Sequence, residues 1–170
     1  MTALVDRFPA PSKLGLLAAL GSGALLGGAY WFQYVVGLAP CTMCYWQRWP
    51  HMVAIAAGLC ALAAFARPRL ALVLLLVAIT ALIVTAVIGV YHVGVEYRWW
   101  PGPQTCSGSV PVGLSAEQLK KYLFGAKMVR CDETAWSLWG ISMAGWNAIC
   151  SAGLAFLLAS GLSTWIRAQR

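Results

Sequence analysis

Two cysteines in the first third of the chain have the spacing of a redox dithiol. Cys41 and Cys44 enclose Thr42 and Met43, and Pro40 precedes them, where a long apolar segment begins. A helix that starts there presents its free backbone N–H groups and the positive end of its dipole to the thiols, and both favour an anion. Such surroundings lower the pKa of a Cys-X-X-Cys thiol from about 8.5 into a range of roughly 3.5 to 7.5. The spacing therefore predicts a reactive dithiol.

A positive charge follows the dithiol into the apolar segment. Arg48 lies four residues after Cys44 and His51 seven after it, so on an uninterrupted helix the three share one face. Because a guanidinium inside a membrane needs a partner, Arg48 is expected to bind a thiolate or the polar head group of an apolar cofactor. The alternative is that its long side chain reaches the membrane surface. Pro50 kinks helices, which affects the position of His51 more than that of Arg48.

Two further cysteines, Cys106 and Cys131, lie in the one long polar stretch of the chain. In the topology that the apolar segments and the basic residues predict, they fall on the same side of the membrane as Cys41 and Cys44. Disulfides persist outside the cytoplasm, so four cysteines on that side favour thiol–disulfide exchange. Four cysteines allow three pairings, and the spacing leaves all three open.

Three more residues are interpreted from their depth in apolar segments. His92 lies near the end of the third segment, at a depth like that of Arg48. It either hydrogen-bonds the same ligand or is an ordinary boundary histidine. Cys60 and Cys150 lie deep inside their segments, where a lone cysteine is usually a small apolar packing residue.

Metal and haem sites fit the sequence less well than disulfides. The dithiol matches half of a four-cysteine zinc site, but the two loop cysteines are 25 residues apart, far from the usual knuckle of about 2 to 4. Haem attachment needs a histidine after the second cysteine, where this chain has Tyr45. A membrane haem held between His51 and His92 is the alternative. No metal site is predicted.

The composition places these residues in a membrane protein. Of the 170 residues, 61% are hydrophobic and only 10% are charged, with a mean hydropathy of +0.73, whereas a soluble domain carries about 25% charged residues. This excludes a disordered chain, a nucleic-acid-binding tail and an ordinary soluble enzyme, and no nucleic-acid partner is expected. The net charge of +7 is therefore interpreted as a signal of topology in the lipid bilayer.

Four apolar segments predict an all-α integral membrane protein, a bundle of four transmembrane helices with a long extracytoplasmic loop. Three segments exceed the roughly 20 residues that cross a bilayer, and the second has a polar entrance. The first is longer than a signal-peptide core of about 7 to 15 residues, so an uncleaved span is expected. Gly23 and Gly27 in it would allow close contact with another helix. The spans are placed at about 14–36, 45–65, 70–93 and 142–166, within a single domain of residues 1–170.

The predicted orientation rests on the density of basic residues. One side has six lysines and arginines in 21 residues, around both termini and the turn at 66–69, and the other side has six in 58 residues. The denser side is assigned to the cytoplasm. Both termini are then cytoplasmic, and loops of about 37–44 and 94–141 lie outside with the four cysteines.

The long outer loop carries tryptophans at both ends, which is typical of a membrane–water boundary. Inside it, Ser115 and Gln118 match a capping box, and apolar residues follow at helical spacing from Leu119 to Ala126. This predicts a short amphipathic helix that lies on the membrane surface. Packing on the protein's own loop is the alternative.

Together these features resemble the disulfide bond formation protein B (DsbB) family of bacterial inner-membrane thiol oxidases. The resemblance covers most of the chain. It rests on four spans with both ends inside, on Cys41-Thr42-Met43-Cys44 followed by Gln47-Arg48, on the outer loop with its two cysteines, and on the stretch Trp136–Asn147. It implies a place in the bacterial inner (cytoplasmic) membrane, with the active cysteines facing the periplasm.

The resemblance implies two redox disulfides, Cys41–Cys44 and Cys106–Cys131. A reduced periplasmic oxidase of the thioredoxin fold, similar to DsbA, would attack the loop disulfide, and Cys106 would form the mixed disulfide. Electrons would pass to the first pair by exchange, through a transient bond between Cys41 and Cys131.

The resemblance also implies a membrane quinone, ubiquinone or menaquinone, as the electron acceptor. It would receive electrons from Cys44, beside Arg48 and His92. Pro50, His51 and the spacing of the outer loop depart from the family's best-known member. The choice of quinone, a general or dedicated partner, and the oligomeric state therefore stay open.

Two alternatives to a thiol oxidase are kept. One is a thiol–quinone reductase similar to vitamin K epoxide reductase, which Arg48 and the placement of the loop cysteines disfavour. The other is a non-catalytic four-helix haem or metal carrier.

Overall fold

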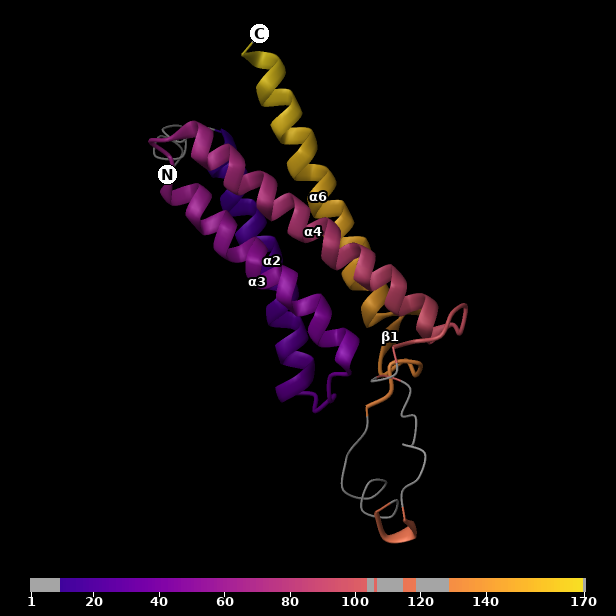
Figure 1. Cartoon of the computed structure of the whole chain (residues 1–170). Helices are drawn as coiled ribbons and strands as arrows, with labels where there is room; N and C mark the ends of the chain where they lie inside the picture. The colour runs from indigo at the N-terminus through magenta and orange to yellow at the C-terminus, as the bar shows by residue number, and fades with distance from the viewer. Residues whose placement is uncertain (1–9, 104–105, 107–114, 119–128, 170) are drawn as a thin grey trace.

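A computed structural model of the chain describes residues 10–103, 106, 115–118 and 129–169. This described part has four long helices and a short β-ribbon: α2 (Ala10–Tyr34), α3 (Thr42–Ala63), α4 (Pro68–Glu96), β1 (Ser137–Leu138), β2 (Ile141–Ser142) and α6 (Met143–Ala168). The helices run alternately up and down, so that α2 begins and α6 ends at the same end of the bundle, with β1 at the other end (Figure 1). α3 packs against α2 and α4, and α4 also packs against α6.

Three of these helices, α2, α4 and α6, are long and apolar enough to cross a membrane. This confirms the predicted helical membrane fold. α3 has 22 residues, but Gln47, Arg48 and His51 make its first half polar. The fourth span at 45–65 and the boundaries of the others stay predictions.

Small residues bring α2 and α3 into backbone contact at the end of the bundle away from β1. A Cβ atom on Gly58 would overlap the carbonyl oxygen of Gly15. Gly23 and Gly27 do not make the close contact that their spacing would allow, because a Cβ atom at either position meets no atom of the described residues within 4 Å. The buried face of α2 runs instead through Gly15, Ala18, Ala19, Ser22 and Leu26.

The two cysteines expected to be packing residues do not lie in the interior. Cys60 and Cys150 are free thiols with exposed side chains. The outward face of a membrane helix is as apolar as its inward face, so apolar neighbours along the chain did not indicate on which face each thiol lies.

The connection between α4 and α6 is described in part. The capping box is confirmed: the Gln118 N–H donates to Ser115 Oγ over 3.3 Å, and the Ser115 N–H donates to Gln118 Oε1 over 3.0 Å. The amphipathic helix predicted to continue over 119–126 lies outside the described residues. Nearer α6, Trp139 and Gly140 both have positive φ, as a two-residue hairpin turn between β1 and β2 requires. This hairpin leads into Ser142, the N-cap of α6.

Candidate active site

The Cys41–Cys44 pair lies at the start of α3, as the spacing predicted. Cys41 is the N-cap, and its sulfur accepts a hydrogen bond from the Cys44 N–H over 3.3 Å. The two Sγ atoms are 2.9 Å apart and both thiols are free. The pair is therefore reduced, with its sulfurs close enough to form a disulfide after a small movement.

The two thiols differ in how readily they ionise. Both precede the predicted span at 45–65. The hydrogen bond between the sulfurs raises the pKa of Cys41, and burial adds to this effect. The same hydrogen bond lowers the pKa of Cys44, and the positive charge of Arg48 helps. Cys44 is thus the sulfur that carries negative charge when the dithiol ionises.

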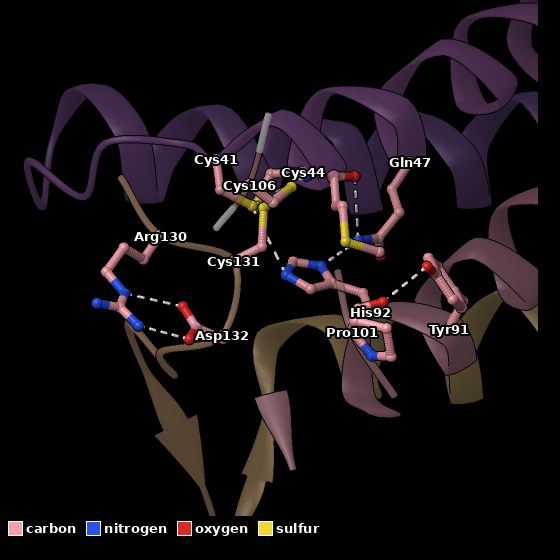
Figure 2. The surroundings of a disulfide bond; sticks show 11 residues. Cys41, Cys44, Gln47, Tyr91, His92, Pro101, Cys106, Arg130, Cys131 and Asp132 are labelled. Atoms are coloured by element: carbon pink, nitrogen blue, oxygen red, sulfur yellow. Dashed lines mark hydrogen bonds and ion pairs between the residues drawn. A yellow bond between two sulfur atoms is a disulfide. The ribbon is translucent and has the colours of Figure 1, made fainter. Parts of the chain in front are cut away.

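The other two cysteines form a disulfide, Cys106–Cys131. Both are buried, and they belong to one apolar cluster with Cys41, Met43 and Val95. Figure 2 shows this disulfide lying directly beside the α3 dithiol. The four cysteines thus converge as predicted, and of the three possible pairings the structure contains the one between the loop cysteines.

Arg48 is buried, with only 7% of its surface exposed, and its partners come from α2. Its guanidinium donates to Gln33 Oε1 and, over 3.4 Å, to the carbonyl oxygen of Ala29. It also lies 5.0 Å from the ring centre of Tyr30 and 5.2 Å from that of Tyr45. Sequence reasoning missed Gln33 and Tyr30, although a glutamine within an apolar span was a signal that could have found the first.

His92 reaches the dithiol from α4. Its Nε2 lies 3.6 Å from Cys41 Sγ, and its Nδ1 lies 2.8 Å from the amide nitrogen of Gln47. Figure 2 shows the ring between the cysteine cluster and Gln47. The ligand atoms of Cys41, Cys44 and His92 all lie within 4.8 Å of one another. His92 is therefore placed to act on the dithiol itself.

A buried hydrogen-bond network continues from Gln47 to α6. Asn147 Nδ2 donates to Gln47 Oε1 over 2.7 Å and to Thr85 Oγ1 over 3.1 Å. Asn147 Oδ1 lies 2.9 Å from Nε2 of His51. The network joins α3, α4 and α6 through side chains that sequence reasoning had not assigned to the site. Asn147 was noticed only as the end of a family-like stretch, although an amide in an apolar span has to find a polar partner.

A cavity of about 310 Å³ lies beside the dithiol and this network. Its volume is at the lower end of the roughly 300 to 1,000 Å³ that small-molecule sites occupy. Its polar lining includes Cys44, Gln47, Arg48, His51, His92 and Asn147. Apolar side chains of α2 and α6, such as Leu25, Phe32 and Trp146, form the other walls. An apolar molecule with a small polar head group fits such a lining.

Comparison with known proteins decides the family. The family model described as "Disulfide bond formation protein DsbB" matches residues 11–161. The chain belongs to the DsbB family. Its membership, with the cysteines found here, makes it a membrane disulfide oxidoreductase with a thiol oxidase role.

Several curated DsbB proteins resemble the chain along most of its length. It is 33% identical over 175 residues to disulfide bond formation protein B of Verminephrobacter eiseniae, with 98% of this chain and 93% of that protein covered. It is 30% identical over 169 residues to disulfide bond formation protein B 2 of Pseudomonas syringae pv. syringae, with 90% and 91% covered. The protein from Haemophilus influenzae strain 86-028NP is 30% identical over 155 residues, with 88% and 84% covered. No solved structure matches the chain.

Proposed function

We propose that the protein oxidises a periplasmic dithiol protein of the thioredoxin fold and passes the electrons to a membrane quinone. One observation carries this proposal: a disulfide and a reduced dithiol lie in one buried cluster, and the dithiol borders a cavity with a buried arginine. A disulfide oxidoreductase needs an electron entrance and an electron exit, and this arrangement supplies both.

The electrons enter at the loop disulfide. A thiolate of the reduced partner attacks Cys106, and the bond to Cys131 breaks. The Cys131 thiolate then attacks Cys41 of an oxidised Cys41–Cys44 pair, and Cys44 leaves as a thiolate. The second thiol of the partner attacks the mixed disulfide and releases Cys106 as a thiolate. Cys106 then attacks Cys131, the bond between Cys131 and Cys41 breaks, and Cys41 leaves as a thiolate. Two electrons have then moved from the partner to the α3 pair, and the loop disulfide is restored. The presence of Cys41 and Cys131 in one buried cluster supports this order.

The electrons leave at Cys44. A quinone held in the cavity supplies a two-electron acceptor that also takes up the two thiol protons. On the protein side, the lowered pKa of Cys44 favours the thiolate as donor. Arg48 and His92 line the same cavity. Arg48 is proposed to hold a quinone oxygen, and His92, whose ring nitrogens face Gln47 and Cys41, is proposed to act on the dithiol beside it.

We place the protein in the bacterial inner membrane with both termini in the cytoplasm and the cysteines in the periplasm. The cysteine cluster includes Cys41, where α3 begins, and Val95, where α4 ends. This end of the bundle is opposite the start of α2 and the end of α6 (Figure 1). A disulfide at that end is stable in an oxidising compartment.

The test is an anaerobic reaction of the purified protein with a reduced thioredoxin-fold oxidase and decyl-ubiquinone or a menaquinone analogue, followed by quinone absorbance. Wild type is expected to reduce one of the quinones while the partner is oxidised. Cys44→Ser should abolish quinone reduction. Cys60→Ser is the matched control, because Cys60 is free and exposed. Equal activity of Cys44→Ser and wild type would show that Cys44 does not donate the electrons to quinone.

A metal carrier is the second candidate, and the convergence of Cys41, Cys44 and His92 within 4.8 Å favours it. Two thiolates and an imidazole suit zinc or copper(I). Metal analysis and an absorption spectrum separate the candidates. The oxidase should be active without metal or haem, whereas a carrier should be inactive toward quinone and hold stoichiometric metal.

A further inference from the structure

His51 is a polar residue of the cavity that the proposed electron route does not use. It is 3% exposed and lines the cavity together with Arg48 and Cys44. Its Nε2 contacts Asn147, but its Nδ1 is buried without a hydrogen-bond partner among the described residues. A buried polar atom without a partner is costly, so a ligand that satisfies it gains affinity.

The contacts of Asn147 determine which nitrogen of His51 carries the proton. The Thr85 hydroxyl donates to the backbone carbonyl of Gln47 over 3.0 Å, so the same oxygen must accept from Asn147 Nδ2 at 3.1 Å. This orients the Asn147 amide with Oδ1 toward His51 Nε2, 2.9 Å away. A carbonyl oxygen only accepts, so Nε2 bears the hydrogen and Nδ1 of the neutral ring has a free lone pair.

The hydrogen bonds between Asn147 and the dithiol also have determined directions. Gln47 Oε1 accepts from Asn147, so Gln47 Nε2 donates to His92 Nδ1 over 2.8 Å. The hydrogen of the His92 ring is then on Nε2, which faces Cys41 Sγ at 3.6 Å. Four hydrogen bonds in series thus all donate in the direction from His51 to Cys41, and each strengthens the next. The network therefore holds His51 in the tautomer whose Nδ1 accepts.

We propose that His51 Nδ1 accepts a hydrogen bond from a hydroxyl of the reduced quinone, the quinol, and makes no such bond to the oxidised quinone. A quinone carbonyl has no hydrogen to donate, whereas the quinol hydroxyl has one. In the overall step the dithiol loses two electrons and two protons to form a disulfide, and the quinone gains both to become the quinol. A residue that binds the quinol better than the quinone favours this direction, because preferential binding of a product shifts its equilibrium.

This inference rests on the proposed function and gives His51 a role in binding quinol, the product, in preference to quinone. It predicts that the cavity binds quinol more tightly than quinone by about fivefold, the effect of one hydrogen bond between neutral partners.

The test measures binding rather than turnover. Decyl-ubiquinol and decyl-ubiquinone are titrated anaerobically into protein carrying Cys44→Ser, which prevents electron transfer. Quenching of tryptophan fluorescence reports binding, because Trp136 and Trp146 line the cavity. The ratio of the two dissociation constants is the quantity compared.

Two substitutions separate the acceptor role from a structural role. His51→Gln keeps an N–H at the position of Nε2 for Asn147 but has no atom at the position of Nδ1. His51→Asn keeps an oxygen near the position of Nδ1 but does not reach Asn147. The expected result is that His51→Gln binds both ligands equally, with quinone affinity within about twofold of the parent, and that His51→Asn keeps part of the preference for quinol.

An unchanged preference in His51→Gln would overturn the inference while leaving the proposed function intact. Loss of the preference in His51→Asn alone would also overturn it, because only the contact with Asn147 would then matter. If the parent binds neither quinol nor quinone, the proposed function and the inference both fail.

Discussion

The two ends of the helix bundle are held together by different kinds of contact. Where α2 begins, its backbone touches α3 at Gly15 and Gly58, and the core beside it consists of alanine, leucine and isoleucine side chains. At the cysteine end, Gln47, His92 and Asn147 join α3, α4 and α6 by hydrogen bonds.

Because their contacts differ, the two ends of the bundle have different roles: one contributes mainly to stability and the other to redox chemistry. Apolar packing has no preferred direction and is sensitive mainly to volume. A hydrogen bond fixes the orientation of both partners, so the cysteine end determines which atom faces the dithiol and which faces the cavity. Substitutions at the packed end should change the free energy of unfolding, and substitutions at the cysteine end should change redox activity.

The largest effect is expected from Cys106→Ala. Oxidation of a protein dithiol should be lost completely, because the loop disulfide cannot form. Quinone reduction driven by dithiothreitol should continue, because the α3 dithiol is intact. Both rates are read from quinone absorbance, and Cys60→Ala should leave both unchanged. Continued oxidation of the protein partner by Cys106→Ala would mean that electrons enter directly at α3.

Arg48→Gln should raise the quinone KM by roughly 10- to 100-fold, the effect of losing one or more charge-assisted hydrogen bonds. The rate of exchange with the partner dithiol should change little. Steady-state kinetics in both substrates measure this. Arg67→Gln, an exposed arginine at the other end of the bundle, is the control. If KM stays constant while the protein unfolds more easily, Arg48 only anchors α3 to α2.

Gly58→Ala tests the packed end. Its new Cβ atom would overlap the Gly15 carbonyl oxygen and lie 3.0 Å from the Ala19 nitrogen, so the backbone of α2 or α3 must move. We expect a loss of about 1 to 3 kcal/mol in the free energy of unfolding, measured by denaturation in mixed micelles. Gly27→Ala is the matched control, because a Cβ atom there meets nothing. Activity per folded molecule should be unchanged in both. A loss of activity without a loss of stability would contradict the division between the two ends.

The smallest measured change is expected in the reactivity of Cys44 when Cys41→Ala removes the hydrogen bond that lowers the pKa of Cys44. This variant lacks the α3 redox pair and should not turn over, so only its alkylation is measured. The pKa of Cys44 should rise toward the ordinary thiol value, so the thiolate fraction near neutral pH falls. The pH profile of Cys44 alkylation by iodoacetamide should therefore shift to higher pH, with a severalfold slower reaction at pH 7. Cys41→Ser keeps a donor and should shift the profile less. Identical profiles for wild type and Cys41→Ala would show that Arg48 and the helix N-terminus lower the pKa of Cys44 without a contribution from Cys41.

Features that depend on neighbours along the chain were predictable. The apolar stretches of α2, α4 and α6, the start of α3 at the dithiol and the capping box at Ser115 follow from local patterns. Features that depend on the rotation of one helix against another were not. Gly23 and Gly27, whose spacing would allow a close contact, make none with the described helices, whereas Gly15 does.

The sequence by itself determined that this is a helical membrane protein with a reactive Cys-X-X-Cys pair at a helix start and a charge one turn into that helix. These properties come from hydropathy, spacing and helix geometry, which need no distant partner. The tertiary structure decided that Arg48 is held by α2, that the loop cysteines pair beside the dithiol, and that Asn147 orients a histidine 96 residues away. In a membrane chain most faces of a helix are apolar, so the pattern does not specify which face turns inward. Only the packed helices bring the polar atoms together.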